Sequence, residues 1–336
     1  MSKEFFRKNW FLAGIFTALT CGLLFPEFGH RINPNHLTNS IIIIVQFLIL
    51  GLTLPSESIL AGLKSFRLHT FVQLFIFVLT PLFFWLTSSL LRHTMEEGLY
   101  IGILALACLP TTVSSCIIFT QLSGGNVSAT MFNASLSNIL GVILSPLLLS
   151  LLLGSTGKGL PAEEVTRVLL NLCRSMLLPI GIGQGSRILF KNLKKIVETH
   201  RKKLGILGNL LILTVIFLAL SGAARNPALT GNLNWLLLPF LYLALSQILL
   251  TGASYAGARM FRFSSQDLIS ITYTAPQKTL AVGIPLLSMY FSQNPEILGL
   301  AILPLLFYHP WQLIVAGIFK GSVVPIIRAG ERKSAG

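Results

Sequence analysis

Charged side chains are scarce in this sequence of 336 residues and make up only 11% of it. A soluble globular protein carries about 25% charged residues. Acids are the scarcest group, because 11 aspartate and glutamate residues stand against 25 lysine and arginine residues, a formal net charge of +14. Hydrophobic residues make up 53% of the chain, and its mean hydropathy is +0.76. The composition therefore excludes an ordinary soluble domain and predicts an all-α polytopic membrane protein.

Sequence motifs of pumps and enzymes are absent too. A GxxxxGK[ST] phosphate-binding loop does not occur, so an ATP-driven pump within this one chain is not expected. An interior carboxylate pair, a cluster of metal ligands and a Ser/His/Asp spacing are also missing, which argues against an intramembrane enzyme. We expect no catalytic residues and no cofactor other than a coupling ion.

The four cysteines are Cys21, Cys108, Cys116 and Cys173, and all fall within apolar segments. They show neither CxxC spacing nor Cys/His spacing of the kind that binds metal. We expect them to be small buried side chains without disulfides.

Apolar stretches of about 20 residues, the length that crosses a bilayer as a helix, recur along the whole chain. They predict ten spans, at residues 10–25, 37–54, 69–91, 98–120, 126–153, 165–187, 204–224, 234–257, 267–292 and 297–324. No soluble domain separates these spans.

Basic residues gather in the loops on one side of the predicted spans. Eighteen lie on the side of the N-terminus: Lys3, Arg7, Lys8, Lys64, Arg67, Arg187, Lys191, Lys194, Lys195, Arg201, Lys202, Lys203, Arg259, Arg262, Lys320, Arg328, Arg332 and Lys333. Five lie on the other side: Arg31, Arg92, Lys158, Arg167 and Arg225. Because cytoplasmic loops carry the excess of basic residues, both termini are predicted to be cytoplasmic. The positive charge thus needs no nucleic-acid partner, and the basic 191–203 loop is expected to contact lipid headgroups.

Lys278 lies near the middle of the 267–292 span, directly after Pro276 and Gln277. A lysine at that depth costs at least a few kcal/mol, so such residues usually face a cavity and mark a substrate or ion path. Pro276 has no N–H and is expected to break the helix, which exposes backbone polar groups. The alternative is a kinked helix along which Lys278 extends to the membrane surface.

A similar interruption occurs five spans earlier, where residues 108–115 read CLPTTVSS. Interrupted segments at matching positions of two halves point to the central site of a transporter. Because five is odd, the second half enters from the opposite side. The pattern therefore predicts two inverted five-helix repeats, residues 1–153 and 154–336.

An anionic substrate is expected at these interruptions. The N-terminus of a half-helix exposes N–H groups and the positive end of the helix dipole, which favour carboxylate, sulfate or phosphate. Thr111, Thr112, Gln277 and Thr279 lie at the interruptions and are expected to contact the substrate. The only two charges within spans, Lys278 and Arg174, are positive and are expected to contact it too. For Arg174, extension toward the lipid headgroups is the alternative to a substrate contact.

Short motifs spread over the chain carry a resemblance to a known family. They are RKNWFLAG at 7–14, GLTL at 51–54, CLPTTVSS at 108–115, GGN at 124–126, FNAS at 132–135, LPIGIGQ at 178–184, QKTLAVGIP at 277–285 and PLLFYHPWQ at 304–312. With these motifs the chain resembles the bile acid:sodium symporter family over essentially its whole length, in particular the cotransporter 7-like branch. The resemblance implies a panel of spans one, two, six and seven, and a core of spans three to five and eight to ten. The broken spans four and nine would cross in the core, beside a substrate cavity between core and panel.

The resemblance also implies a change in ion binding. Sodium-coupled members carry a glutamate on the broken ninth span, and matching Gln277 to the glutamine of that motif places Tyr273 at the glutamate position. At about 5 Å and an effective dielectric constant of about 20, a sodium ion and the amine of Lys278 repel by roughly 3 kcal/mol. We therefore expect Lys278 to replace one sodium ion by neutralising the carbonyl ends of the crossed half-helices. Proton coupling stays an alternative to sodium coupling.

A second cation site is implied by residues that match the family's hydroxyl and amide ligands. These are Ser114, Ser115, Thr130, Asn133 and Gln73. The alternative is structural: the hydroxyl groups bond back to helix carbonyls, and the amide only joins helices.

His309 matches a histidine on span ten that borders the substrate in the family, while Pro310 replaces the neighbouring asparagine. His309 is therefore expected to contact the substrate, and a structural histidine beside a proline kink is the alternative.

Together these features favour a secondary active transporter that moves a small organic anion by alternating access. The alternative is a membrane regulator of ion homeostasis, or of an envelope or glycan pathway, that transports nothing. Compact spans and short loops favour a bacterial cytoplasmic membrane. The substrate and the oligomeric state stay open at this point.

Overall fold

The computed structural model describes residues 3–53, 65–155, 166–167, 170–171, 173–224, 233–325 and 327. These residues form helices and turns, and no strand occurs among them, so the all-α prediction is confirmed for this part of the chain. The helices are α1 (Lys3–Leu24), α2 (Pro26–Ile32), η1 (Pro34–His36), α3 (Leu37–Thr53), α5 (Phe66–Leu74), η3 (Phe75–Leu79), α6 (Thr80–Ser89), η4 (Arg92–Thr94), α7 (Glu97–Cys108), α8 (Ser114–Leu122), α9 (Val127–Ser155), η5 (Cys173–Leu177), α11 (Leu178–Leu189), α12 (Lys191–Thr199), α13 (Arg201–Ala223), η6 (Leu233–Leu236), α15 (Leu237–Met260), α16 (Ser265–Thr274), α17 (Leu280–Tyr290) and α18 (Pro295–Ser322).

Several residues used in the sequence analysis lie outside the described ranges. They are Leu54 of the GLTL motif and the basic residues Lys64, Lys158, Arg225, Arg328, Arg332 and Lys333. The proposed boundary between the two repeats, at residues 153–154, falls within α9.

Within the described part of the chain, six helical stretches are long and apolar enough to cross a membrane. They are Pro34–Thr53, Phe66–Ser89, Val127–Ser155, Arg201–Ala223, Leu237–Met260 and Pro295–Ser322, and each falls in a predicted span. The other four predicted windows contain α1, the η5–α11 segment and the two interrupted segments described below. Residues 10–24 of α1 form a further candidate span together with α2, from which they are bent by 96°.

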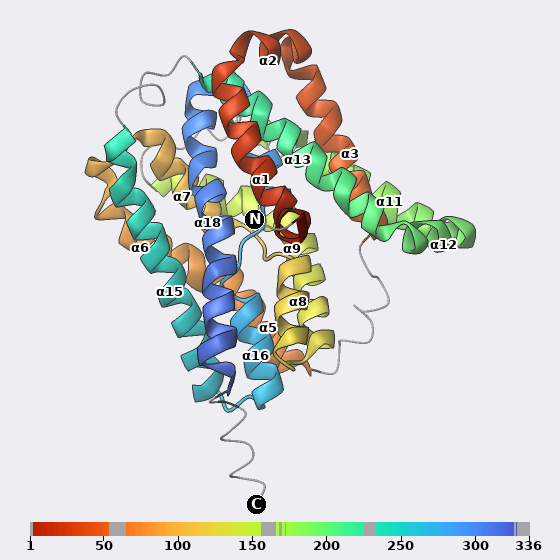
Figure 1. Cartoon of the computed structure of the whole chain (residues 1–336), viewed down its shortest axis with the longest axis vertical. Coiled ribbons are helices and arrows are strands. Elements are labelled where there is room, and N and C mark those ends of the chain that lie inside the picture. The colour runs from red at the N-terminus through yellow and green to blue at the C-terminus, as the bar shows by residue number, and fades with distance from the viewer. Residues whose placement is uncertain are drawn as a thin grey trace, which may run out of the picture.

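The helices pack in two groups. The helices α1, α3, α11 and α13 contact one another, and Figure 1 shows them together on one side of the molecule. On the other side α7 and α15 pack against α18, while α8 and α16 pack against α9. The two groups meet where α13 contacts α17 and α18.

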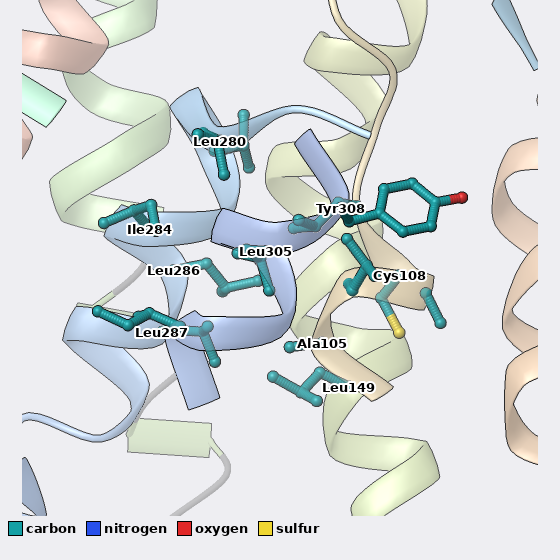
Figure 2. Packing of buried hydrophobic residues seen from close by; sticks show 14 of the residues in the cluster. Ala105, Cys108, Leu149, Leu280, Ile284, Leu286, Leu287, Leu305 and Tyr308 are labelled. Carbon is teal, nitrogen blue, oxygen red and sulfur yellow. The ribbon is translucent and has the colours of Figure 1, made fainter. Parts of the chain in front are cut away.

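Two helical segments are interrupted in the second group. One is broken at residues 109–113 between α7 and α8, the other at residues 275–279 between α16 and α17. Apolar side chains pack closely beneath both interruptions, and Figure 2 shows Cys108 and Ala105 of α7 near Leu149 of α9 and Leu305 of α18. The interruptions are therefore enclosed by protein, as membrane-buried irregular backbone must be.

All four cysteines are free, as expected. Cys108 and Cys116 are buried and Cys21 is half-buried, but Cys173 is exposed. The expectation that all four are buried is therefore wrong for Cys173. An apolar sequence environment does not show which face of a helix turns inward, and a lipid-facing surface is as apolar as a core.

We predict that Gly102 is required for the packing of α7 on α18. A Cβ atom at this position would lie 2.2 Å from the carbonyl oxygen of Ala301, which is backbone and cannot move aside cheaply. Gly102→Ala should lower the free energy of unfolding by about 1–3 kcal/mol. Thermal unfolding in detergent measures the change. The matched control is Gly252→Ala on α15, where no atom lies within 4 Å. Equal melting temperatures for both variants would contradict the prediction.

Candidate functional site

The two interruptions touch each other. The backbone N–H of Thr279 donates a hydrogen bond of 3.0 Å to the carbonyl oxygen of Pro110. Both segments contain a proline, Pro110 in one and Pro276 in the other. Proline disfavours a helical conformation in the residue before it, and Leu109, before Pro110, is extended. Ala275, before Pro276, keeps helical dihedral angles, but Pro276 has no N–H with which to continue the hydrogen bonds of α16.

Lys278 is buried at this contact, with only 2% of its surface exposed. Its Nζ atom donates to the carbonyl oxygens of Leu109 at 2.8 Å, Ala107 at 3.0 Å and Ile76 at 3.3 Å. A protonated lysine has three N–H donors, so three carbonyl acceptors satisfy it fully. The alternative of a lysine that extends to the membrane surface does not fit this geometry.

The local sequence explains why these carbonyls are free. The last carbonyls of a helix have no partner within it, and α7 ends at Cys108. Lys278 binds the carbonyls of Ala107 and Leu109, and the Ser145 hydroxyl donates to that of Cys108 at 2.8 Å.

The third carbonyl, that of Ile76, belongs to the π-helix η3. In a π-helix the partner of a carbonyl is the N–H five residues later. For Ile76 this residue is Pro81, which has no N–H. The proline therefore leaves an acceptor that the lysine of a distant segment binds.

Gln312 of α18 holds the backbone of Lys278 from the other side. Its Oε1 atom accepts from the N–H of Lys278 at 2.8 Å, and its Nε2 atom donates to the C=O of Lys278 at 2.9 Å. The Nε2 atom also lies 3.0 Å from Nδ1 of His309, one turn earlier. Sequence reasoning did not single out Gln312, although a lone amide one turn after His309 in an apolar helix was a usable signal.

Gln277 joins the interrupted segments through its side chain. Its Oε1 atom accepts from Thr112 and from Ser115, both at 2.8 Å, and from the thiol of Cys116 at 3.3 Å. Thr111 is buried close by, and its hydroxyl lies 3.3 Å from Cys116 Sγ. Gln277, Thr111 and Thr112, all predicted substrate contacts, are thus brought together with Ser115.

The remaining residues of the predicted cation site fall into separate pairs. The Thr130 hydroxyl lies 2.7 Å from that of Ser270 and 3.0 Å from that of Thr120. Gln73 donates from Nε2 to both the carbonyl and the Oδ1 atom of Asn133, each at 3.2 Å. The hydrogen bonds of Gln73 therefore go to α9, and not to the interruption after α16.

Tyr273 takes no part in these ion-site contacts. Its ring stacks on Phe119 with centroids 5.6 Å apart, and its hydroxyl lies 2.8 Å from that of Ser123. Among the described residues, no cluster of three or more His, Cys, Asp or Glu side chains is placed to hold a metal ion.

A cavity of about 360 Å³ lies where the two groups of helices face each other. Five predicted site residues line it, namely Thr112, Ser114, Ser115, Thr279 and His309. Five polar residues that were not predicted line it too: Gln46, Thr53, Asn138, Arg201 and Asn209. Arg174 is exposed and is not among the lining residues, so the structure does not bring it to the others.

The chemistry of this cavity favours an anion. The first turns of α8 and α17 line it, through Ser114, Ser115, Leu280 and Ala281. The Thr279 hydroxyl caps α17 by accepting from the N–H of Ala281 at 3.2 Å. Two positive helix ends and Arg201 therefore line one hollow, and none of the described residues that line it is acidic.

An all-helical membrane bundle with two interrupted helices that meet beside a cavity is the arrangement of a secondary transporter. The chain belongs to the SBF-like CPA transporter family, whose model matches residues 9–323. It is 30% identical over 323 residues to sodium/bile acid cotransporter 7 of Danio rerio, which covers 94% of each chain. It is 32% identical over 316 residues to YfeH of Escherichia coli strain K12, which covers 92% of this chain and 90% of that protein. The protein is thus an integral membrane transporter and not an enzyme, and the resemblance noted in the sequence is confirmed.

We predict that Gln312 supports the interruption structurally. Gln312→Leu leaves the buried N–H and C=O of Lys278 without their side-chain partner, at about 1–3 kcal/mol each. The free energy of unfolding should therefore fall by about 2–5 kcal/mol, as measured by denaturant or thermal unfolding in detergent. Gln121→Leu, at an exposed position on α8, is the control and should change little. A Gln312→Leu protein as stable as the control would show that the two hydrogen bonds contribute nothing.

Proposed function

We propose that the protein is a secondary active transporter that moves a small organic anion by alternating access. In this proposal the amine of Lys278 replaces one of the sodium ions that the family uses. The single observation that carries the proposal is the set of three carbonyl oxygens around Lys278 Nζ, at 2.8–3.3 Å. Backbone carbonyls are ligands that a hard cation such as sodium prefers, and here a tethered cation binds them.

Electrostatics favour a positive charge at this place. The C-terminal end of a helix carries about half a negative charge, and α7 ends at the carbonyls that Lys278 binds. A sodium ion close to the amine would be repelled by roughly 3 kcal/mol at about 5 Å. The protonated amine is attached to the chain and stays at the interruption, whereas a sodium ion stabilises it only while the ion is bound.

The proposed architecture has ten spans in two inverted five-helix repeats. The interrupted segments α7–α8 and α16–α17 are the fourth and ninth of these spans, and their contact through Thr279 and Pro110 supports the crossing. The group of α1, α3, α11 and α13 corresponds to the proposed panel, and the other helices form the core. The cavity between them is the proposed substrate site.

The coupling ion is proposed to be sodium, and relatives named sodium/bile acid cotransporters support this choice. Its ligands would come from Ser114, Ser115, Thr130, Asn133 and Gln73, which offer hydroxyl and amide oxygens but no carboxylate. In the described chain these residues already bond to neighbours such as Ser270, so binding an ion requires those hydrogen bonds to rearrange. Coupling to protons is the competing mechanism.

The substrate contacts are proposed to be Thr111, Thr112, Gln277, Lys278, Thr279 and His309. Lys278 is not among the residues that line the cavity and its amine already binds three carbonyl oxygens, so its own contact requires the amine to move. Arg201 joins them at the cavity, while a contact from Arg174 requires that its exposed side chain turn inward. The proposed location is a bacterial cytoplasmic membrane with both termini in the cytoplasm, supported by the excess of basic residues on one side.

We predict that Lys278→Ala folds but does not transport, because three carbonyl oxygens lose their cation. The same oxygens then become available to sodium, so the melting temperature of the variant should rise more with sodium chloride than that of the unchanged protein. A sodium concentration ten times the dissociation constant corresponds to about 1.4 kcal/mol of stabilisation. Arg259→Ala, at an exposed position on α15, serves as the control. Full transport by Lys278→Ala would refute the role of the amine.

We predict that an organic anion stabilises the purified protein, and that the size of this stabilisation depends on the coupling ion. A thermal-shift screen of organic anions, each in sodium, potassium or at low pH, measures this, because a ligand that binds the folded state raises its stability. Counterflow of the labelled hit in proteoliposomes then separates a transporter from a regulator. A ligand that binds but shows no counterflow would overturn transport as the function.

A further inference from the structure

The short helix α12 lies at the edge of the molecule, between the end of α11 and the start of α13 (Figure 1). Residues 191–203, expected from the sequence to be a basic loop, form α12 and the first residues of α13. The helix packs on α3, α11 and α13, and α13 is one of the six candidate membrane spans. This position places α12 where the ends of α11 and α13 reach the membrane surface.

One side of α12 is apolar, and only part of that side is covered. Leu193, Ile196 and Val197 follow one another at helical spacing, which places them on one face of the helix. Val197 is buried, whereas Ile196 is 56% exposed and Phe190, directly before the helix, is 62% exposed. Leu189 at the end of α11 is exposed as well. An apolar strip therefore continues from the end of α11 onto α12.

The other side of α12 and the start of α13 are basic. Residues 191–203 contain six lysine or arginine residues and a single acid, Glu198. Arg187 of α11 donates from Nη2 to Glu198 Oε1 at 3.1 Å, so this acid is already paired and the segment stays strongly positive. The exposed apolar and basic residues considered below are Phe190, Lys195, Ile196, Lys202 and Lys203, here called the α12 surface.

The combination of charge and exposed apolar side chains fits a phospholipid. A helix with one apolar and one basic side lies in the plane of the membrane surface, with its apolar side at the acyl chains. Lysine side chains are long enough to reach the headgroups from there. An acidic protein or a free anion would use the positive charge, but it would not account for the exposure of Phe190 and Ile196 beside the membrane.

We propose that the α12 surface binds an anionic phospholipid of the cytoplasmic leaflet. Phe190 and Ile196 contact the acyl chains, and the three lysines bind the phosphate of the headgroup. None of the five residues lines the cavity between the two helix groups, so this site is separate from the proposed substrate site. Because α12 is joined to α11 by an ion pair and packs on α3 and α13, the bound lipid anchors this group of helices to the membrane surface.

The charges and the exposed area set the expected affinities. A lysine near an anionic membrane surface contributes about 5-fold in affinity, so three lysines contribute about 10- to 100-fold. The half-exposed side chain of Ile196 contributes about 5-fold for any phospholipid, because acyl chains are common to all of them. The protein should therefore bind phosphatidylglycerol about 10- to 100-fold more tightly than phosphatidylcholine with the same acyl chains.

The test titrates the purified full chain in detergent with each of these two lipids. Native mass spectrometry counts the bound lipids, and the shift of the melting temperature gives the dissociation constant. The variant Lys195→Gln/Lys202→Gln/Lys203→Gln should lose about 10- to 100-fold in affinity for phosphatidylglycerol and keep its affinity for phosphatidylcholine. High salt should reduce the preference of the unchanged protein for phosphatidylglycerol, because salt screens exposed charges.

The variant Ile196→Ser tests the apolar half of the surface. It should weaken the binding of both lipids by about 5-fold, whereas the lysine variant weakens only phosphatidylglycerol. Without lipid, both variants should melt at the temperature of the unchanged protein, because the changed side chains are exposed. Unchanged lipid binding by Ile196→Ser would overturn the proposed contact with the acyl chains.

The matched control is Arg259→Gln/Arg262→Gln/Lys320→Gln. It removes three basic residues near the ends of α15 and α18, on the side that is also predicted to be cytoplasmic. This variant should keep the affinity of the unchanged protein for phosphatidylglycerol. An equal loss of affinity in the two triple variants would show a general effect of surface charge and would overturn a site at α12.

Other occupants would give different results. Equal binding of phosphatidylglycerol and phosphatidylcholine to the unchanged protein would overturn recognition of the headgroup. Stabilisation by inorganic phosphate or by poly-glutamate, without any by phosphatidylglycerol, would assign the surface to a free anion or to an acidic protein and would also overturn the proposal. These measurements need no transported anion, so their outcome is independent of the proposed transport function.

Discussion

The contact of one amine with three carbonyl oxygens holds the centre of this structure together. Lys278 Nζ binds backbone groups of η3 and of the end of α7, and these segments come from distant parts of the chain. Inside a membrane an unpaired carbonyl costs several kcal/mol, and so does an unpaired charge. Each compensates the other here, so two groups that are separately unfavourable become a stable unit.

The rest of the interruption follows the same rule. Ser145 pairs with the carbonyl of Cys108, Gln312 pairs with both backbone groups of Lys278, and the Tyr308 hydroxyl donates to the carbonyl of Pro276 at 3.2 Å. Backbone that leaves the helix at membrane depth is tolerated only when its polar groups are satisfied in this way. The carbonyl groups at the C-terminal ends of α7 and α16 are thus bound by side chains within the core. The N-terminal turns of α8 and α17 face the cavity instead.

The sequence predicted the interruptions and the buried amine because both depend on local features. A proline in an apolar span breaks a helix wherever it stands, and a lysine at mid-span must find partners. The sequence did not predict the hydrogen-bond partners of Lys278. Ile76 lies 202 residues away, and its carbonyl is free only because it belongs to the π-helix η3 and the N–H it would need is missing at Pro81. Gln312, Gln46 and Arg201 were missed because the role of an ordinary polar residue depends on its neighbours in the folded structure, which the sequence does not show. The expectation for Cys173 failed because lipid and core are equally apolar, and the cavity role of Arg174 depends on a helix rotation that no sequence pattern fixes.

The missing N–H of Pro81 has a mechanical consequence. Because it frees the carbonyl that Lys278 binds, η3 is joined to the segment between α16 and α17 by a buried hydrogen bond. Sliding the end of α7 past the segment that carries Lys278 by even one turn would take the carbonyl oxygens of Ala107 and Leu109 away from the amine. In the proposed transport cycle the helices joined by this contact would therefore move together, and the shift that exposes the cavity to the opposite side would fall on their boundary with α3 and α13.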